Sequence, residues 1–285
     1  MRLLEPHPPT DATTNRQHWY ARLSLGFAND RGTTRLTERS HVGPLRVQKP
    51  LYPEQPSVCH AIVVHPPGGV VGGDQLAINC VVGDSAHALI TTPGAAKWYR
   101  ANGHVSRQDV ALRVGAGASL EWLPQETIFY NGADVALDTA IEMAADASFI
   151  TSDILCFGRT ASGESFDHGR VSQRLQVRRG GKLVWFEQGA LVGGDDGFAG
   201  PLGLHGNTVC ATLLAVGRTA GAACLQALRE EASDRFGVTQ MKSVLVARYI
   251  GDSSQEARRL MHRAWGVLRP ALLERDPIVP RIWQT

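Results

Sequence analysis

Three carboxylates stand where a charged side chain is unexpected. Asp74 closes a loop rich in glycine and proline, whereas Asp153 and Glu187 each interrupt an apolar strand. A carboxylate buried among apolar residues is costly unless it is paired, protonated or bound to a cation. Each of the three could pair with an arginine, such as Arg159 or Arg100, or cap backbone donors. Together they also fit a polar channel or a path for cations.

The loop 65–74 has the sequence HPPGGVVGGD and lies between two expected strands. Its glycines have the spacing of a phosphate-binding loop, but Asp74 and Gln75 follow where that loop needs Lys and then Ser or Thr. A carboxylate there would repel phosphate, and no Gly-x-Gly-x-x-Gly leads into a helix. His65 begins the loop, and we expect it to be either a metal ligand beside Asp74 or a structural residue.

The charge and composition of the chain bear on which kinds of partner it could bind and in which compartment it would fold. The 285 residues carry 29 basic and 27 acidic side chains, and a net charge of +2 gives no argument for nucleic acid or an anionic membrane. Five scattered cysteines without a Cys-x-x-Cys pair favour a reducing compartment, and we expect the cytoplasm. No apolar run approaches the ~18 residues of a membrane span. We expect residues 1–18 to form a flexible tail and 19–285 a single domain.

The strands that must position these residues repeat loosely along the chain. Four apolar segments can be superposed through Leu89, Leu120, Phe149 and Leu183, and small-residue turns precede them. Repeats of this size are typical of stacked supersecondary units. The pattern therefore predicts a mostly β fold of stacked, β-helix-like sheets. An ordinary β-sandwich with evenly spaced turns is the alternative.

The C-terminal third is expected to carry two α-helices. The segment 253–256 is a capping box, and apolar residues follow it at helical spacing until Pro270, where we expect the helix to stop. A shorter helix is predicted at 222–231. The tail 277–285 carries Ile282 and Trp283 and is predicted to dock onto another surface.

A second set of carboxylates suggests a different function. Glu121 and Glu126, together with Asp153, could serve acid–base chemistry in a β-stacked carbohydrate-active enzyme. Such an enzyme needs an exposed aromatic groove, but the tryptophans 98, 122 and 185 lie in apolar stretches typical of a core. Glu121 itself alternates with apolar residues, which predicts a solvated strand face. The sequence contains no recognised catalytic signature.

Five blocks, in this order, resemble the UreD (UreH) family of urease accessory proteins. The blocks are HPPGGVVGGD at 65–74, TTPGAAKWY at 91–99, EWLPQE at 121–126, DILCFGR at 153–159 and PRIWQT at 280–285. The resemblance runs from about residue 19 to the C-terminus. It implies a mostly β, helix-like stack with two helices and no enzymatic activity.

The resemblance also implies partners and a cargo. Members of the family bind apo-urease and a second accessory protein, UreF, which recruits the nickel-carrying GTPase UreG. The assembly helps to install the two-nickel centre of urease, and a water-filled tunnel lined by acidic residues is thought to carry the nickel. By motif these residues fall on Asp74, Asp153 and Glu187, with His65 as a further candidate ligand. Gln75 and the pair 55–56 replace acidic residues that are common in the family, so the tunnel entrance is expected to be less acidic.

The residue types suit a conduit better than a storage site. Nickel(II) accepts carboxylate, imidazole and water, and isolated carboxylates would hold it weakly enough to release it. A cage of Cys and His would trap the ion. We therefore expect nickel in transit and no tightly bound cofactor.

Overall fold

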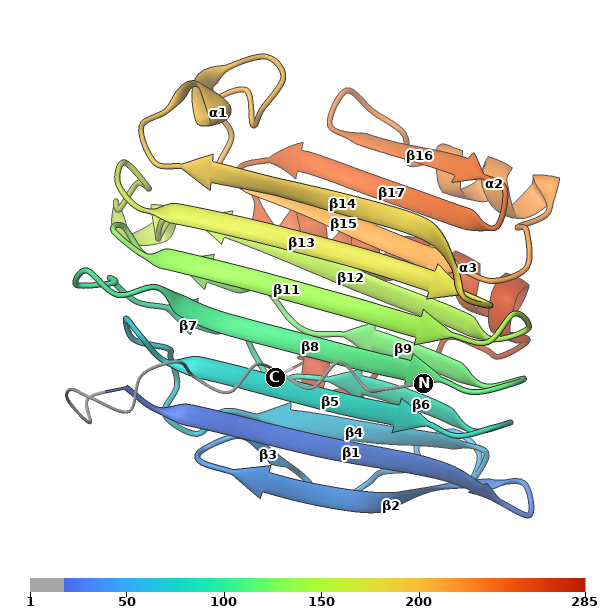
Figure 1. Ribbon diagram of the computed structural model, residues 1–285. Helices are drawn as coiled ribbons and strands as arrows, with labels where there is room; N and C mark the ends of the chain where they lie inside the picture. Colours follow the sequence, from blue (N-terminus) through green and yellow to red (C-terminus); the bar gives the residue numbers. More distant parts are fainter. Residues whose placement is uncertain (1–17, 285) are drawn as a thin grey trace.

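The structure of the protein, a computed structural model, describes residues 18–284. Two large sheets face each other, and the longest helix covers the outer side of one of them (Figure 1). Residues 1–17 of the predicted tail lie outside the described residues. His18 packs its ring 4.5 Å from that of His104. No helix within residues 18–284 is long and apolar enough to cross a membrane.

The first sheet has seven strands in the order β14-β13-β11-β8-β5-β1-β2. Its strands are β1 (Tyr20–Asp30), β2 (Thr33–Val42), β5 (Gln75–Val82), β8 (Ser106–Val114), β11 (Asp134–Met143), β13 (Arg170–Arg179) and β14 (Lys182–Val192). Along β8, buried residues alternate with more exposed ones, as in a strand with one face against a core. One face of this sheet therefore faces the second sheet, and the other faces solvent.

The second sheet has ten strands, of which eight follow the order β16-β17-β15-β12-β9-β6-β4-β3. They are β3 (Arg46–Val47), β4 (Val58–Val64), β6 (His87–Thr91), β9 (Ser119–Leu123), β12 (Ser148–Phe157), β15 (Val209–Val216), β16 (Phe236–Met241) and β17 (Val244–Gly251). The other two, β7 (Ala96–Trp98) and β10 (Thr127–Phe129), run parallel to the end of β12.

The predicted β-helix-like stacking is confirmed. The chain passes repeatedly from one sheet to the other, and successive passes lie parallel: β5, β8, β11 and β13 in the first sheet, and β4, β6, β9 and β12 in the second. The alignment of Leu120 with Phe149 is confirmed, but the first member of the repeat is shifted by one residue, because Ala88 rather than Leu89 pairs with Leu120. Its fourth member, in β14, lies in the other sheet and pairs antiparallel with β13. An apolar strand pattern does not specify which sheet receives the strand.

Aromatic side chains fill the corner where β7, β10 and β12 stack. Trp98, Phe129 and Phe157 end these three strands and are almost completely buried, and the rings of Phe129 and Phe157 lie 5.4 Å apart. Val70, from the loop between β4 and β5, adds a parallel bridge to Trp98. The glycine-rich loop is therefore one more level of the same stack.

The long helix α3 (Ser254–Leu273) lies on the outer face of the second sheet and begins as predicted. The Ser253 hydroxyl oxygen accepts a hydrogen bond of 3.1 Å from the Glu256 N–H. The predicted stop at Pro270 is wrong, because the helix continues to Leu273. Proline removes one backbone donor, but buried Leu268 and Leu272 hold the last turn against the sheet. The other helices are α1 (Asp196–Ala199) and α2 (Ala222–Arg229).

The C-terminal tail docks onto its own chain, where it forms a 3₁₀ turn, η2 (Arg281–Gln284). Trp283 is buried, its ring stacks 4.3 Å from that of His262, and its indole N–H donates to the Thr91 hydroxyl at 2.7 Å. The apolar residues of the tail thus have a role inside the fold. A second 3₁₀ turn, η1 (Thr160–Ser162), follows β12.

Candidate functional site

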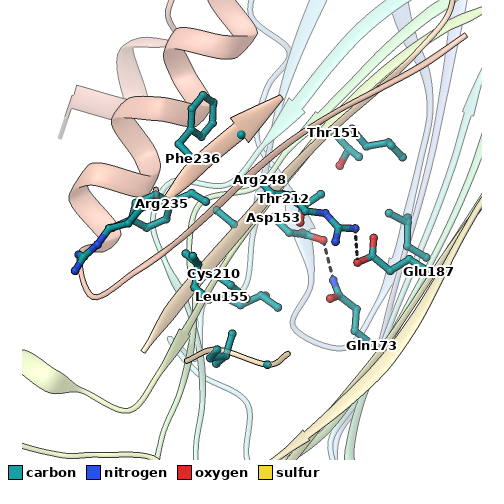
Figure 2. A pocket seen from close by; sticks show the side chains of 18 of the residues that line it. Thr151, Asp153, Leu155, Gln173, Glu187, Cys210, Thr212, Arg235, Phe236 and Arg248 are labelled. Atoms are coloured by element: carbon teal, nitrogen blue, oxygen red, sulfur yellow. Dashed lines mark hydrogen bonds and ion pairs between the residues drawn. The ribbon is translucent and has the colours of Figure 1, made fainter. Parts of the chain in front are cut away.

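A pocket of about 490 Å³ lies between the two sheets, where β13 and β14 face β12, β15, β16 and β17 (Figure 2). Its polar lining includes Asp153, Gln173, Glu187, Thr212 and Arg248. A volume of this size holds roughly ten or more waters at about 30 Å³ each. A hydrated cation would therefore fit inside it.

Asp153 projects from β12 into this pocket. Its Oδ2 accepts a hydrogen bond of 3.0 Å from the Gln173 side-chain amide on β13. Burial and, to a smaller extent, the negative charge of Glu187 raise the pKa of the Asp153 carboxyl to about 6, although the hydrogen bond from Gln173 acts in the opposite direction. The pKa of Asp153 therefore lies closer to neutral pH than that of an exposed aspartate.

Glu187 reaches the same pocket from the opposite sheet. Its Oε1 lies 2.7 Å from Nη2 of Arg248 on β17, and both side chains are partly exposed. The sequence suggested Arg159 or Arg100 as the partner of such a carboxylate, but the partner of Glu187 is Arg248. Arg159 pairs with Glu164. The structure thus brings Asp153 and Glu187 together across the two sheets.

Asp74 lies elsewhere and caps backbone donors. Its side chain accepts hydrogen bonds from the Trp19 N–H at 2.9 Å and the Val71 N–H at 3.2 Å. Three strand spacings, about 14 Å, separate β5 from β13. Gly72 is required for this turn, because a Cβ there would lie 1.7 Å from the Ala101 carbonyl oxygen. The loop therefore fixes one buried carboxylate at a distance from the pocket.

His65 lies at the start of the same loop, within range of the charge on Asp74. Burial lowers the pKa of the His65 imidazole, and the negative charge of Asp74 acts in the opposite direction. A neutral imidazole can bind a metal. However, no group of three or more His, Cys, Asp or Glu side chains among residues 18–284 is arranged to hold a metal ion.

Sequence reasoning missed Arg248 and Gln173. A signal for Arg248 was present, because this residue interrupts the apolar strand β17 just as Asp153 interrupts β12. Gln173 gave no signal, since polar residues are frequent along β13. Only the pairing of distant strands shows that these two side chains meet the carboxylates.

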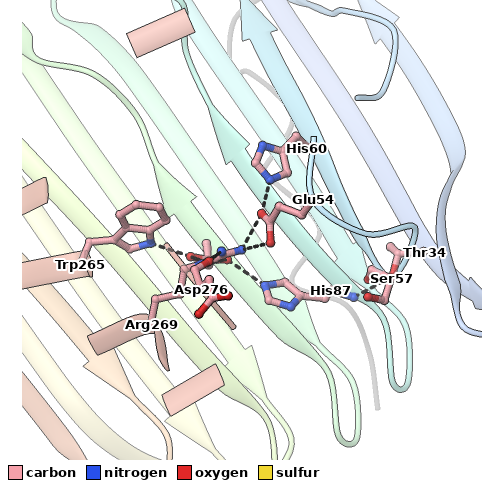
Figure 3. Close-up of polar contacts among 9 residues, drawn as sticks. Thr34, Glu54, Ser57, His60, His87, Trp265, Arg269 and Asp276 are labelled. Atoms are coloured by element: carbon pink, nitrogen blue, oxygen red, sulfur yellow. Dashed lines mark hydrogen bonds and ion pairs between the residues drawn. The ribbon is translucent and has the colours of Figure 1, made fainter. Parts of the chain in front are cut away.

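The second set of carboxylates is occupied by structural partners. Glu121 is fully buried, so the predicted solvated face is wrong. Its oxygens accept from Arg269 Nε at 3.1 Å and from the Trp265 indole N–H at 2.6 Å, and Oε1 lies 2.8 Å from His87 Nε2 (Figure 3). Glu126 forms an ion pair with Arg258 on α3. Neither carboxylate is free for acid–base catalysis.

Arg269 is the centre of this buried network. Its guanidinium also contacts both carboxylate oxygens of Glu54, at 2.7 and 2.9 Å, and donates to the Asp276 carbonyl oxygen; Glu54 in turn meets His60 at 2.6 Å. Burial would raise the pKa values of Glu54 and Glu121, but hydrogen bonds and the charge of Arg269 outweigh it and lower both. The network joins α3 to the second sheet and to the tail.

A family model and individual relatives match nearly the whole chain, and all carry the same description. A family model described as "UreD urease accessory protein" matches residues 20–284. The urease accessory protein UreD of Janthinobacterium sp. (strain Marseille) is 65% identical over 270 residues, which cover 93% of this chain and 91% of that protein. UreD of Nitrosospira multiformis is 52% identical over 271 residues, with 93% and 97% covered. UreD of Dechloromonas aromatica is 46% identical over 283 residues, with 97% and 98% covered.

Proposed function

Because the chain belongs to the UreD family of urease accessory proteins, we propose that it binds apo-urease and a UreF–UreG complex and helps deliver nickel(II) to urease. It is an accessory protein and not an enzyme. The observation that carries the nickel proposal is the meeting of Asp153 and Glu187 in one pocket large enough for a hydrated ion. These are two of the three carboxylates expected to line a nickel path.

The chemistry of the pocket supports transit rather than storage. Two carboxylates from facing sheets supply oxygen ligands, and water would complete the coordination of the ion. Nickel is thus the cargo, with no tightly bound cofactor. Asp74 and His65 would extend the path if an ion bound the Asp74 carboxylate beside, or in place of, the two backbone N–H groups that donate to it.

We also place this activity in the cytoplasm. All five cysteines are free, three of them buried, and none forms a disulfide. Free thiols of this kind persist in a reducing compartment. The cytoplasmic thiol pool would supply such conditions during assembly with apo-urease.

Co-purification tests the partner proposal. We expect the full chain, carrying an affinity tag and coexpressed with apo-urease, to recover urease subunits from the lysate. Adding UreF should increase the yield of the complex and adding UreG should give the complete assembly. The recovery is read from stained gels against a tag-only control. If neither urease nor UreF is retained above that control, the proposed accessory role of this chain is wrong.

A further inference from the structure

Arg248 occupies the position from which a positive charge can compete for the pocket carboxylates. In the second sheet Asp153 pairs with Thr212, and Thr212 pairs with Arg248, so all three lie in one row across β12, β15 and β17. Paired residues of neighbouring strands project to the same face. From this row the Arg248 side chain crosses to Glu187 on the other sheet (Figure 2).

Each of the two pocket carboxylates has a partner on a strand of the opposite sheet. Glu187 makes its ion pair with the guanidinium of Arg248, and Asp153 accepts from Gln173. The other charged groups in the lining are Asp234 and Arg235, which precede β16. A divalent ion that binds Glu187 must therefore displace Arg248 or share the carboxylate with it.

We propose that Arg248 is an internal counter-ion that competes with nickel(II) for Glu187 and so keeps the ion weakly bound. A guanidinium and a divalent cation beside the same carboxylate repel each other, and this repulsion weakens the binding of the ion. As the ion enters, the guanidinium swings aside; as Arg248 returns to Glu187, it favours release of the ion. This role deepens the proposed nickel path and rests on it.

A purely structural role predicts a different result. The Arg248–Glu187 pair also joins β17 to β14, so its loss could merely loosen the two sheets. A pair this exposed contributes little to stability. If the pair only ties the sheets together, removing Arg248 should lower the melting temperature and leave nickel affinity unchanged or lower. If Arg248 competes with the ion, removing it should raise nickel affinity.

The test is nickel(II) binding to the tag-free full chain, measured by competition with a chromophoric chelator. We expect Arg248→Gln to bind nickel about tenfold more tightly than the wild type, and Arg248→Lys to lie between them. Arg259→Gln is the matched control, because Arg259 is similarly exposed and bridges Glu231 and Glu256, neither of which lines the pocket. Its nickel affinity should equal that of the wild type.

Unchanged or weaker binding by Arg248→Gln would overturn the counter-ion role, as would an equal gain in Arg259→Gln. Asp153→Asn separates this failure from failure of the nickel path itself. If the wild type binds nickel and Asp153→Asn weakens that binding, the path stands and only the role of Arg248 is in question. If neither the wild type nor any variant binds nickel, both proposals fail.

Discussion

Replacing Arg269 by alanine is expected to lower the free energy of unfolding by about 3–5 kcal/mol at pH 7. Arg269 is fully buried and is the shared partner of Glu54 and Glu121. Without it, two buried carboxylates lose their cation, and the tail loses its contact at the Asp276 carbonyl. Urea denaturation followed by circular dichroism measures the loss. It should shrink as the pH falls below about 4.5, because there the wild type gradually loses the stability that comes from the lowered pKa values of Glu54 and Glu121.

Arg263→Ala is the control for this experiment. Arg263 lies on the same helix but is half-exposed, and its nearest carboxylate oxygen, on Glu231, is 3.6 Å away. An exposed pair of this kind is worth about 0–1 kcal/mol. A loss in Arg269→Ala no larger than in Arg263→Ala would show that the network does not secure α3.

Asp153→Asn is expected to make the protein more stable at pH 7. The pKa of Asp153 is raised to about 6 in the folded protein, against about 3.9 when unfolded. Ionisation at pH 7 therefore costs the folded state about 2–3 kcal/mol, and asparagine removes this cost. The gain should be full above pH 6, decline as the pH falls between 6 and 4, and vanish below.

Denaturation of wild type and variant at pH 7.5 and pH 4 checks this dependence. In Asp153→Asn the side-chain amide oxygen can still accept from Gln173, so the pocket geometry is preserved. Asp146→Asn, at an exposed turn between β11 and β12, should change stability by less than about 0.5 kcal/mol at either pH. If Asp153→Asn instead lowers the free energy of unfolding, the ionised carboxylate makes a favourable contact in the folded protein, and its burial is not a cost to stability.

Local patterns in the sequence predicted much of the fold. The capping box at Ser253 located the start of α3, and recurrent apolar strands with small-residue turns indicated the stacked sheets. The end of α3 was missed, because burial of Leu272 outweighs the hydrogen bond lost at Pro270. The phase of the repeat and the sheet of β14 depend on pairing between strands, which local patterns do not encode.

For the site as well, local sequence patterns predicted some residues, and others became visible only in the fold. Asp153 and Glu187 could be recognised because each is a charge within an apolar strand. Arg248, the partner of Glu187, lies 61 residues further along the chain, so only the fold shows the ion pair. Glu121 was misplaced for the same reason, since its burial depends on Arg269, 148 residues away.

The nickel content of urease tests the central claim most directly. Urease would be purified from cells whose only copy of this chain is either the wild type or the double variant Asp153→Asn with Glu187→Gln, grown at limiting nickel. Co-purification with apo-urease confirms that the variant still assembles. We expect nickel per urease active site, measured by elemental analysis, to fall at least tenfold with the double variant. Urease that is fully loaded by an assembled double variant would contradict delivery through this pocket.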